Sequence, residues 1–255
     1  MKVYFLGTGT SQGIPVIGNS DPVCKSLDKK DKRLRVSVWI SCHDFSVVID
    51  CGPDFRQQML ASNCPNIDAI LFTHEHSDHT AGIDDIRPFN FKQRQEIAIF
   101  AHERVIKNLQ KRFDYVFETE NKYPGAPSIQ INEVVNNQNF TIKNKTIIPI
   151  NALHGNLQVF GYRIDDFAYL TDIKTIEKQE IDKLKNTKVL VINCLHEKEH
   201  HSHFNLQEAL DFITLVQPGI TYLTHISYTF GFHEEIQKRL PKNVFLAYDN
   251  LEITI

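Results

Sequence analysis

The stretch from His74 to His79 reads His-Glu-His-Ser-Asp-His and places four side chains that can bind metal within six positions. Neutral imidazole and carboxylate groups suit zinc, iron or manganese. His74 and His76 can point at one ion from an extended turn, and Asp78 and His79 can point at a second ion beside it. The alternative is a polar surface turn that happens to be rich in histidine. So dense a set of ligands makes that alternative the weaker interpretation.

A short apolar run, Ile67–Thr73, leads directly into this stretch. Branched and aromatic residues dominate the run, which predicts a buried strand. The candidate ligands therefore begin where a strand ends, so that a rigid element carries a loop with functional side chains.

The same stretch resembles the His-X-His-X-Asp-His signature of the metallo-β-lactamase superfamily. This resemblance implies three later ligands, each at the end of a strand: a third histidine for the first ion, a bridging aspartate, and a last histidine for the second ion. Three candidates follow apolar runs in that order. The implied ligands are His74, His76 and His154 for the first ion, and Asp78, His79 and His225 for the second, with Asp172 bridging the two.

Strand-like segments cluster in each half of the chain, and helix-like segments follow them. This order predicts two packed sheets with helices outside. A chain of 255 residues with 42% hydrophobic content can bury one sizeable core. We therefore expect an α/β protein with the four-layer αβ/βα sandwich of the metallo-β-lactamase fold. Its two mixed sheets would form a single hydrolase domain over residues 1–255.

Several local expectations bear on the site. Thr80–Arg87 is expected to form a helix whose positive end faces the site, and Thr175–Lys185 a second helix. Residues 114–127, which are aromatic and punctuated by proline and glycine, form an excursion that could overhang the site. Asp50 resembles the strand-end aspartate of the family, and we expect it to accept hydrogen bonds that orient a loop or a ligand.

The formal net charge of −3 disfavours broad electrostatic binding to nucleic acid or to an anionic membrane. No apolar run approaches membrane-spanning length. The apolar segment at the start of the sequence is too short for the core of an export signal, because Gly7 interrupts it. With five scattered cysteines and no such signal, we expect reduced thiols in the cytoplasm. The expected partner is a small phosphorylated substrate, with no membrane partner and no nucleic acid; a homodimer is left open.

Two adjacent divalent ions can share a bridging hydroxide, which forms at neutral pH because the ions depress the pKa of water. Zinc and manganese are the favoured ions, with iron as an option. This chemistry favours hydrolysis, but it does not choose between a phosphodiester, a thioester and an amide. We also place Asp78 among the catalytic residues.

A histidine-rich segment, residues 195–206, could supply a further histidine that donates a hydrogen bond or a proton to a leaving oxygen. The alternative is an exposed loop that binds stray metal. We favour His203 over His200, His201 and His196 for this role, and we place His200 second among the catalytic candidates. His203 directly precedes an expected helix, Leu206–Val216, for which Asn205 is a suitable N-cap. A side chain fixed beside a docked helix start is better preorganised than one in the middle of a loop.

The branch within the superfamily can be narrowed by resemblance. The segments Gly7–Gly13, Ile14–Gly18, Asp50–Gln58 and His225–Ser227 resemble the phosphoribosyl cyclic phosphate phosphodiesterases and the related pyrroloquinoline-quinone biosynthesis proteins. The resemblance implies a phosphodiesterase that acts on a small or cyclic phosphodiester. The alternatives are a metal-binding cofactor-biosynthesis protein or an oxidoreductase on the same scaffold, or a thioester hydrolase, because a fold does not fix a function.

One departure from these relatives concerns a structural zinc site. They carry three closely spaced cysteines in the loop after Ile17–Gly18, together with a histidine three residues after the last metal ligand. Here only Cys24 remains in the loop, and Tyr228 occupies the histidine position. A closed tetrahedral zinc site needs four protein ligands. We therefore expect packing and hydrogen bonds to hold the loop instead.

Overall fold

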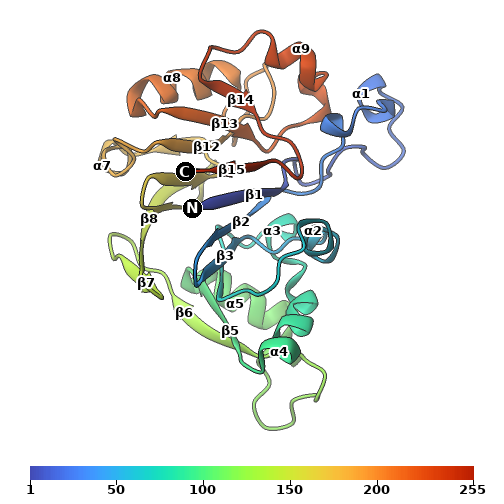
Figure 1. The fold of residues 1–255 in the computed structure, drawn as a ribbon, viewed down its shortest axis with the longest axis vertical. Helices are drawn as coiled ribbons and strands as arrows, with labels where there is room; N and C mark the ends of the chain where they lie inside the picture. The colour runs from blue at the N-terminus through green and yellow to red at the C-terminus, as the bar shows by residue number, and fades with distance from the viewer.

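The structure is a computed structural model that describes residues 1–255 (Figure 1). Its first sheet takes its strands from the amino-terminal half of the chain and from the last residues. The strands from β1 to β3 pair antiparallel, and those from β3 to β6 pair parallel. In spatial order they are β15 (Glu252–Thr254), β1 (Lys2–Gly7), β2 (Ser37–Cys42), β3 (Phe45–Ile49), β4 (Ala69–Leu71), β5 (Ile97–Ala101) and β6 (Ile129–Glu133).

The second sheet repeats this mixture of antiparallel and parallel pairing. The strands from β8 to β10 pair antiparallel, whereas β10, β12, β13 and β14 pair parallel. In spatial order they are β11 (Thr175–Ile176), β8 (Lys145–His154), β9 (Leu157–Ile164), β10 (Phe167–Leu170), β12 (Val189–Asn193), β13 (Ile220–Thr224) and β14 (Val244–Leu246), with β7 (Phe140–Ile142) paired to β8. Because neighbouring parallel strands end at the same edge of a sheet, the residues that follow them gather there.

Helices cover the outer face of each sheet, with α2, α4 and α5 on the first and α8 and α9 on the second (Figure 1). The α-helices are α1 (Pro22–Lys25), α2 (Phe55–Ser62), α3 (Ser77–Thr80), α4 (Arg87–Gln93), α5 (Glu103–Arg112), α6 (Asp114–Phe117), α7 (Lys178–Asp182), α8 (Leu206–Val216) and α9 (His233–Gln237). Three 3₁₀ turns are η1 (Lys29–Asp31), η2 (Ile83–Ile86) and η3 (Tyr228–Phe230). The expected four-layer sandwich with two mixed sheets is therefore confirmed.

The inner layer of the core forms where the two sheets face each other. It is a cluster of 21 buried residues drawn from both sheets, among them Phe5 and Ile40 from the first and Tyr169 from the second. Tyr162 on β9 is fully buried in it, and its hydroxyl donates a hydrogen bond of 2.7 Å to the carbonyl of Phe72 at the end of β4. The interface that buries the apolar side chains thus also joins β9 to the strand that precedes the metal-capable stretch.

Two sequence expectations for helices were wrong in part. The expected helix Thr80–Arg87 is interrupted at Gly82, whose N–H donates to the carbonyl of Cys51 rather than within a helix. A Cβ at Gly82 would approach the Gly52 carbonyl oxygen to 2.1 Å, so this close backbone crossing requires glycine. The expected helix Thr175–Lys185 shortens to α7, because Thr175 and Ile176 instead pair with β8.

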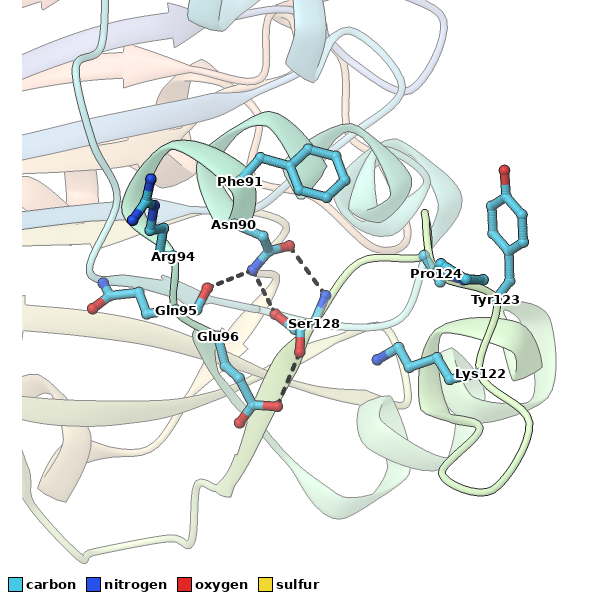
Figure 2. A pocket seen from close by; sticks show the side chains of 10 residues that line it. Asn90, Phe91, Arg94, Gln95, Glu96, Lys122, Tyr123, Pro124 and Ser128 are labelled. Carbon is cyan, nitrogen blue, oxygen red and sulfur yellow. Dashed lines mark hydrogen bonds between the residues drawn. The ribbon is translucent and has the colours of Figure 1, made fainter.

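The excursion formed by residues 114–127 does not overhang the metal-capable stretch. Tyr115 donates a hydrogen bond of 2.7 Å to Asp84, and the later part of the excursion turns toward α4. Together with α4 and the residues that precede β5 and β6, it lines a cavity of about 490 Å³ (Figure 2). That cavity lies at the amino ends of β5 and β6, the edge opposite the one where the candidate ligands gather.

None of the helices combines the length and the apolar character that a membrane-spanning helix requires.

Candidate metal centre

The candidate ligands come from both sheets and lie at strand ends. His74, His76, Asp78 and His79 occupy the turn and short helix after β4. The second sheet supplies the other three. His154 is the last residue of β8, Asp172 lies two residues after the end of β10, and His225 directly follows β13. All seven side chains predicted from the sequence are brought together in the seam between the sheets.

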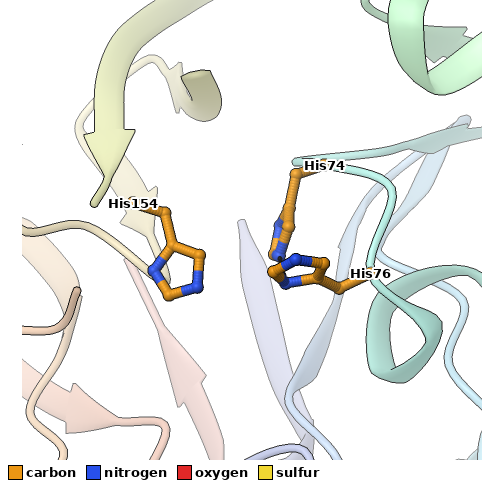
Figure 3. A group of neighbouring side chains, drawn as sticks. All are labelled: His74, His76 and His154. Carbon is orange, nitrogen blue, oxygen red and sulfur yellow. Dashed lines mark hydrogen bonds between the residues drawn. The ribbon is translucent and has the colours of Figure 1, made fainter. Parts of the chain in front are cut away.

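The first group consists of His74, His76 and His154, whose ligand atoms all lie within 4.8 Å of one another. Nε2 of His74 is 2.9 Å from Nδ1 of His76. Figure 3 shows the three rings converging, two from the loop after β4 and the third from the end of β8 across the seam. His76 is exposed and His154 half-buried, so this group opens to solvent.

Hydrogen bonds fix which ring nitrogens of the first group face the common point. Nδ1 of His154 lies 2.8 Å from the carbonyl of Ser202, and a carbonyl can only accept, so this nitrogen carries the proton. Nε2 of His154 is then left with a free lone pair. Nδ1 of His74 lies 3.0 Å from the hydroxyl of Thr73, which likewise leaves its Nε2 for an ion.

The second group consists of Asp78, His79 and His225, all buried. Nε2 of His79 lies 3.2 Å from Asp78 and 3.3 Å from Asp172, and Nε2 of His225 lies 3.1 Å from Asp172. Asp172 also groups with His74 and His79, so its carboxylate lies between the two sets of ligands. This is the placement that a bridging ligand requires.

Asp50 accepts hydrogen bonds from His79 of this group and from Thr73, the residue before His74. One of its oxygens accepts a hydrogen bond of 2.8 Å from the N–H of Thr73, and the other accepts 2.8 Å from the Thr73 hydroxyl and 2.6 Å from Nδ1 of His79. As expected, Asp50 accepts hydrogen bonds, here from the loop at Thr73 and from the candidate ligand His79. Thr73 joins Asp50 to His74, a role that the sequence analysis missed. The signal available was its hydroxyl directly before the first histidine.

The charges of the second group explain its protonation. Burial works to lower the pKa of His79, but the neighbouring carboxylates of Asp78 and Asp50 outweigh burial, and the pKa is raised well above its usual value. Burial works to raise the pKa of Asp172, but the imidazoles of His225 and His79 hold it well below its usual value. Negative carboxylates in a buried site thus attract positive charge.

The residues present fit divalent metal ions. Several buried ring nitrogens have no hydrogen-bond partner: Nε2 of His79, Nδ1 of His203 and both nitrogens of His225. Unpaired buried polar atoms are rare unless a ligand satisfies them. Imidazole and carboxylate are also the donor types that zinc and manganese accept.

Three residues of the site adopt a left-handed backbone that L-residues other than glycine seldom use. The φ angles are 66° at Asp50, 56° at Asp172 and 58° at His225. Each follows the end of a strand, and the reversal turns the side chain toward the seam instead of continuing the pleat.

His203 lies beside the two groups, and His200 lies farther out. His203 is buried, its ring centroid is 4.5 Å from that of His154 and 4.7 Å from that of His225, and its Nδ1 is 3.6 Å from Asp172. The ring centroid of His200 is 5.1 Å from that of His203. Burial lowers the pKa of His203 to about 2, and the nearby His225 adds to this effect.

The site opens into a cavity of about 470 Å³ on the side of the first group. Polar and small residues form most of its lining, and Leu157 is the one apolar side chain. The lining residues are His76, His154, Gly155, Asn156, Leu157, His201 and Ser202.

Cys24 lies away from this centre in a small apolar cluster. It is buried with Ile14 and Val23, and Tyr228 and Phe232 pack against them. Asp21 caps the helix that carries Cys24 by accepting a hydrogen bond of 2.9 Å from the N–H of Val23. Packing and capping therefore hold this loop, as expected.

Residues 46–226 match the family model of the beta-lactamase superfamily domain, and the chain belongs to this family of metallo-β-lactamase-fold proteins. Within it, the chain is similar to a solved diphosphatase of the PhnP family, with 32% identity and a TM-score of 0.92 over 100% of this chain and 97% of that one. Zinc-bound PqqB from Methylobacterium extorquens shares the fold, with 15% identity and a TM-score of 0.83 over 100% of both chains. These matches confirm the resemblance stated for the sequence.

Two curated relatives are longer than this chain. An octanoyltransferase from Porphyromonas gingivalis is 39% identical over 100% of this chain and 52% of its own length. A ribonuclease Z from Bacillus subtilis is 28% identical over 65% of this chain and 49% of its own length. In both alignments, about half of the length of the relative is matched.

Proposed function

We propose that the protein is a metal-dependent phosphodiesterase that uses two divalent ions on a small or cyclic phosphodiester. The observation that carries this proposal is the pair of ligand groups that share Asp172, with the buried His203 beside them. Two relatives support it by name, because a diphosphatase and a ribonuclease both cleave bonds between phosphorus and oxygen.

The residues that would hold the ions are the seven already described, with Asp172 between the groups. Divalent ions bound there would supply Lewis acidity that activates water and neutralises charge on phosphate oxygens. We propose zinc or manganese, with iron as a further option. Asp50 and Ser202 orient His79 and His154 in advance, which lowers the free-energy cost of assembling the site.

The position of the buried His203 against both ligand groups supports a role for it in catalysis. The backbone beside His203 is anchored, because the N–H of the next residue, Phe204, donates to the carbonyl of Ile173. A phosphodiester anion beside His203 would raise the pKa of its ring, since an opposite charge favours the protonated form. We propose that His203 then hydrogen-bonds a phosphate oxygen and protonates the leaving oxygen, an effect worth roughly a hundredfold to ten-thousandfold in rate.

Hydrolysis of an acyl thioester is the second candidate, and the similarity to an octanoyltransferase favours it. The opening of the site argues against it. Leu157 is the one apolar side chain of the cavity beside the first group, so little apolar surface is available to hold an octanoyl chain. A phosphate group suits this polar opening better.

A substrate panel distinguishes the two candidates. Ion-free protein is reconstituted separately with manganese, zinc and iron and is assayed with a cyclic phosphodiester, octanoyl-coenzyme A and a lactam. We expect turnover of the phosphodiester, and Asp172→Ala serves as the inactive control for contaminating enzymes. Faster turnover of the thioester than of the phosphodiester would establish the second candidate instead.

A further inference from the structure

Glu75 lies between two ligands of the first group in the sequence, and its side chain contacts Arg104 on α5. Nε of Arg104 donates to one carboxylate oxygen at 2.7 Å, and Nη2 donates to the other at 3.1 Å. A bidentate pair of this kind constrains direction as well as distance. The pair is not predictable from the sequence, because the two residues are 29 positions apart and no periodicity links them.

The same guanidinium reaches across the seam to the second sheet. Nη2 of Arg104 also donates to the carbonyl of Gln158 at 2.5 Å. Gln158 adjoins Leu157, which pairs with His154 at the end of the β8–β9 hairpin. One side chain therefore contacts the loop that carries His76 and the hairpin that carries His154.

The backbone of His76 is held, because its carbonyl accepts hydrogen bonds from the N–H of His79 and from the Thr80 hydroxyl, but its ring has few restraints. Its side chain is exposed, and its ring contacts that of His74 but makes no hydrogen bond to a residue outside the ligand group. The neighbouring Glu75 is half-buried and held by Arg104. Arg112 and Thr80 hold the backbone of this loop on its own side of the seam, whereas Glu75, through Arg104, is the side chain of the loop that links it to the hairpin carrying His154.

We propose that Arg104 is a positioning residue for the first ion. By holding Glu75 and the carbonyl of Gln158 together, it sets the separation of His76 and His154, and hence the affinity of the first group for an ion. This inference rests on the two-ion site of the proposed function. Loss of a residue that orients metal ligands typically weakens metal affinity about tenfold to hundredfold.

Arg104 is not needed to dock α5. The helix is anchored by the buried side chains of Val105, Ile106 and Leu109. Lys107 offers a matched control, because it forms an ion pair of 2.5 Å with Glu103 on the same helix and is not bonded to the metal-capable stretch. Lys107→Met therefore removes a cation and an ion pair from α5 without disturbing either ligand loop.

The test is a zinc titration of ion-free protein in competition with a chromogenic chelator. His154→Ala and His225→Ala identify the binding steps of the first and second ions. We expect Arg104→Met to weaken the first step about tenfold to hundredfold and to leave the second step unchanged. Lys107→Met should leave both steps unchanged. Arg104→Lys, which keeps the charge but loses the bidentate geometry, should fall between Arg104→Met and the wild type.

Two further measurements separate positioning from general stability. Thermal unfolding of the ion-free variants reports whether α5 remains docked. In the double variant Glu75→Gln, Arg104→Met, the first ion should bind no more weakly than in Arg104→Met alone, since both changes remove the same restraint. Wild-type affinity for both ions in Arg104→Met, or equal weakening of both steps, would overturn the proposal. The titration uses no substrate, so failure of the phosphodiesterase proposal would leave its result intact.

Discussion

The Asp50 carboxylate lies 2.6 Å from Nδ1 of His79, and both side chains are fully buried. The contact fixes the proton of His79 on Nδ1 and directs Nε2 toward Asp78 and Asp172. A carboxylate that is not among the predicted ligands therefore sets the orientation and the tautomer of one imidazole in the second group.

Replacing Asp50 with Asn should weaken binding of the second ion about tenfold to hundredfold. An amide carries no charge, so it no longer stabilises His79 in the same way. Zinc titration of ion-free protein measures the effect. Asp54→Asn is the matched control, because Asp54 accepts a hydrogen bond from the N–H of Arg35 and is not bonded to a histidine. Unchanged affinity for both ions in Asp50→Asn would show that Asp50 does not contribute to metal binding.

The wild-type protein should bind about two divalent ions per chain, and Asp172→Ala should reduce occupancy of both sites, because Asp172 lies between the ligand groups. Elemental analysis of protein without an affinity tag measures the stoichiometry. A third ion is not expected, because Cys24 is packed in an apolar cluster. Zinc seen at Cys24 by anomalous scattering would contradict that part of the prediction.

His203→Ala should keep the fold and both ions but lose roughly a hundredfold to ten-thousandfold in turnover of the best phosphodiester. His203 lies against the ligand groups and is not one of the seven predicted ligands, although a ligand atom of His203 lies within 4.8 Å of His154 and Asp172. His200→Ala is the control, because that ring lies one histidine farther from the site and its loss should matter less. If His203→Ala instead loses an ion, His203 is a ligand and the two groups must be redrawn.

The stability of the protein should depend on pH through Asp249. Burial raises the pKa of Asp249 to about 7, against the opposing effects of hydrogen bonds from Leu34 and Thr8 and the charge of Arg33. The folded protein therefore holds this proton more tightly than the unfolded chain does. The resulting stabilisation is present at low pH and is lost as the pH rises from about 4 to about 7.

Asp249→Asn tests this dependence. The difference in free energy of unfolding between the wild type and the variant should change by on the order of 4 kcal/mol at most across that window. Urea unfolding at a series of pH values measures it. Parallel pH profiles for the two proteins would show that folding does not raise the pKa of Asp249.

The sequence predicted the elements whose signals are local. The helix α8 has the expected bounds, and Asn205 caps it in a reciprocal pair of hydrogen bonds with Glu208. The short strands β11 and β15 were missed, because each pairs with a strand far away in the sequence. Gly82 is visible in the sequence as a residue that disfavours helix. Only the folded structure shows why the expected helix is interrupted there, because the backbone of Gly82 packs closely against that of Gly52.

The ligand candidates were predictable, because their order and their positions at strand ends can be recognised in the sequence, and the structure brings them together. The residues that orient them are harder to predict. Asp50 was visible as a strand-end carboxylate, whereas Arg104 depends on the packing of α5 against the seam. Contacts of that kind depend on tertiary structure, which no periodicity in the sequence encodes.

The backbone is left-handed at Asp50, Asp172 and His225, and at His225 it sets stability against function in the evolution of this chain. Left-handed geometry costs a residue with a Cβ roughly 1–2 kcal/mol, and glycine avoids most of this strain. At Asp50 and Asp172 the buried hydrogen bonds that the carboxylates accept offset this cost, whereas neither ring nitrogen of His225 has a hydrogen-bond partner. Selection for thermal stability alone would therefore favour glycine at His225, and that change would remove a group from the metal centre. A library screened only for folding should accumulate substitutions at His225, whereas one screened for turnover should retain the strained histidine.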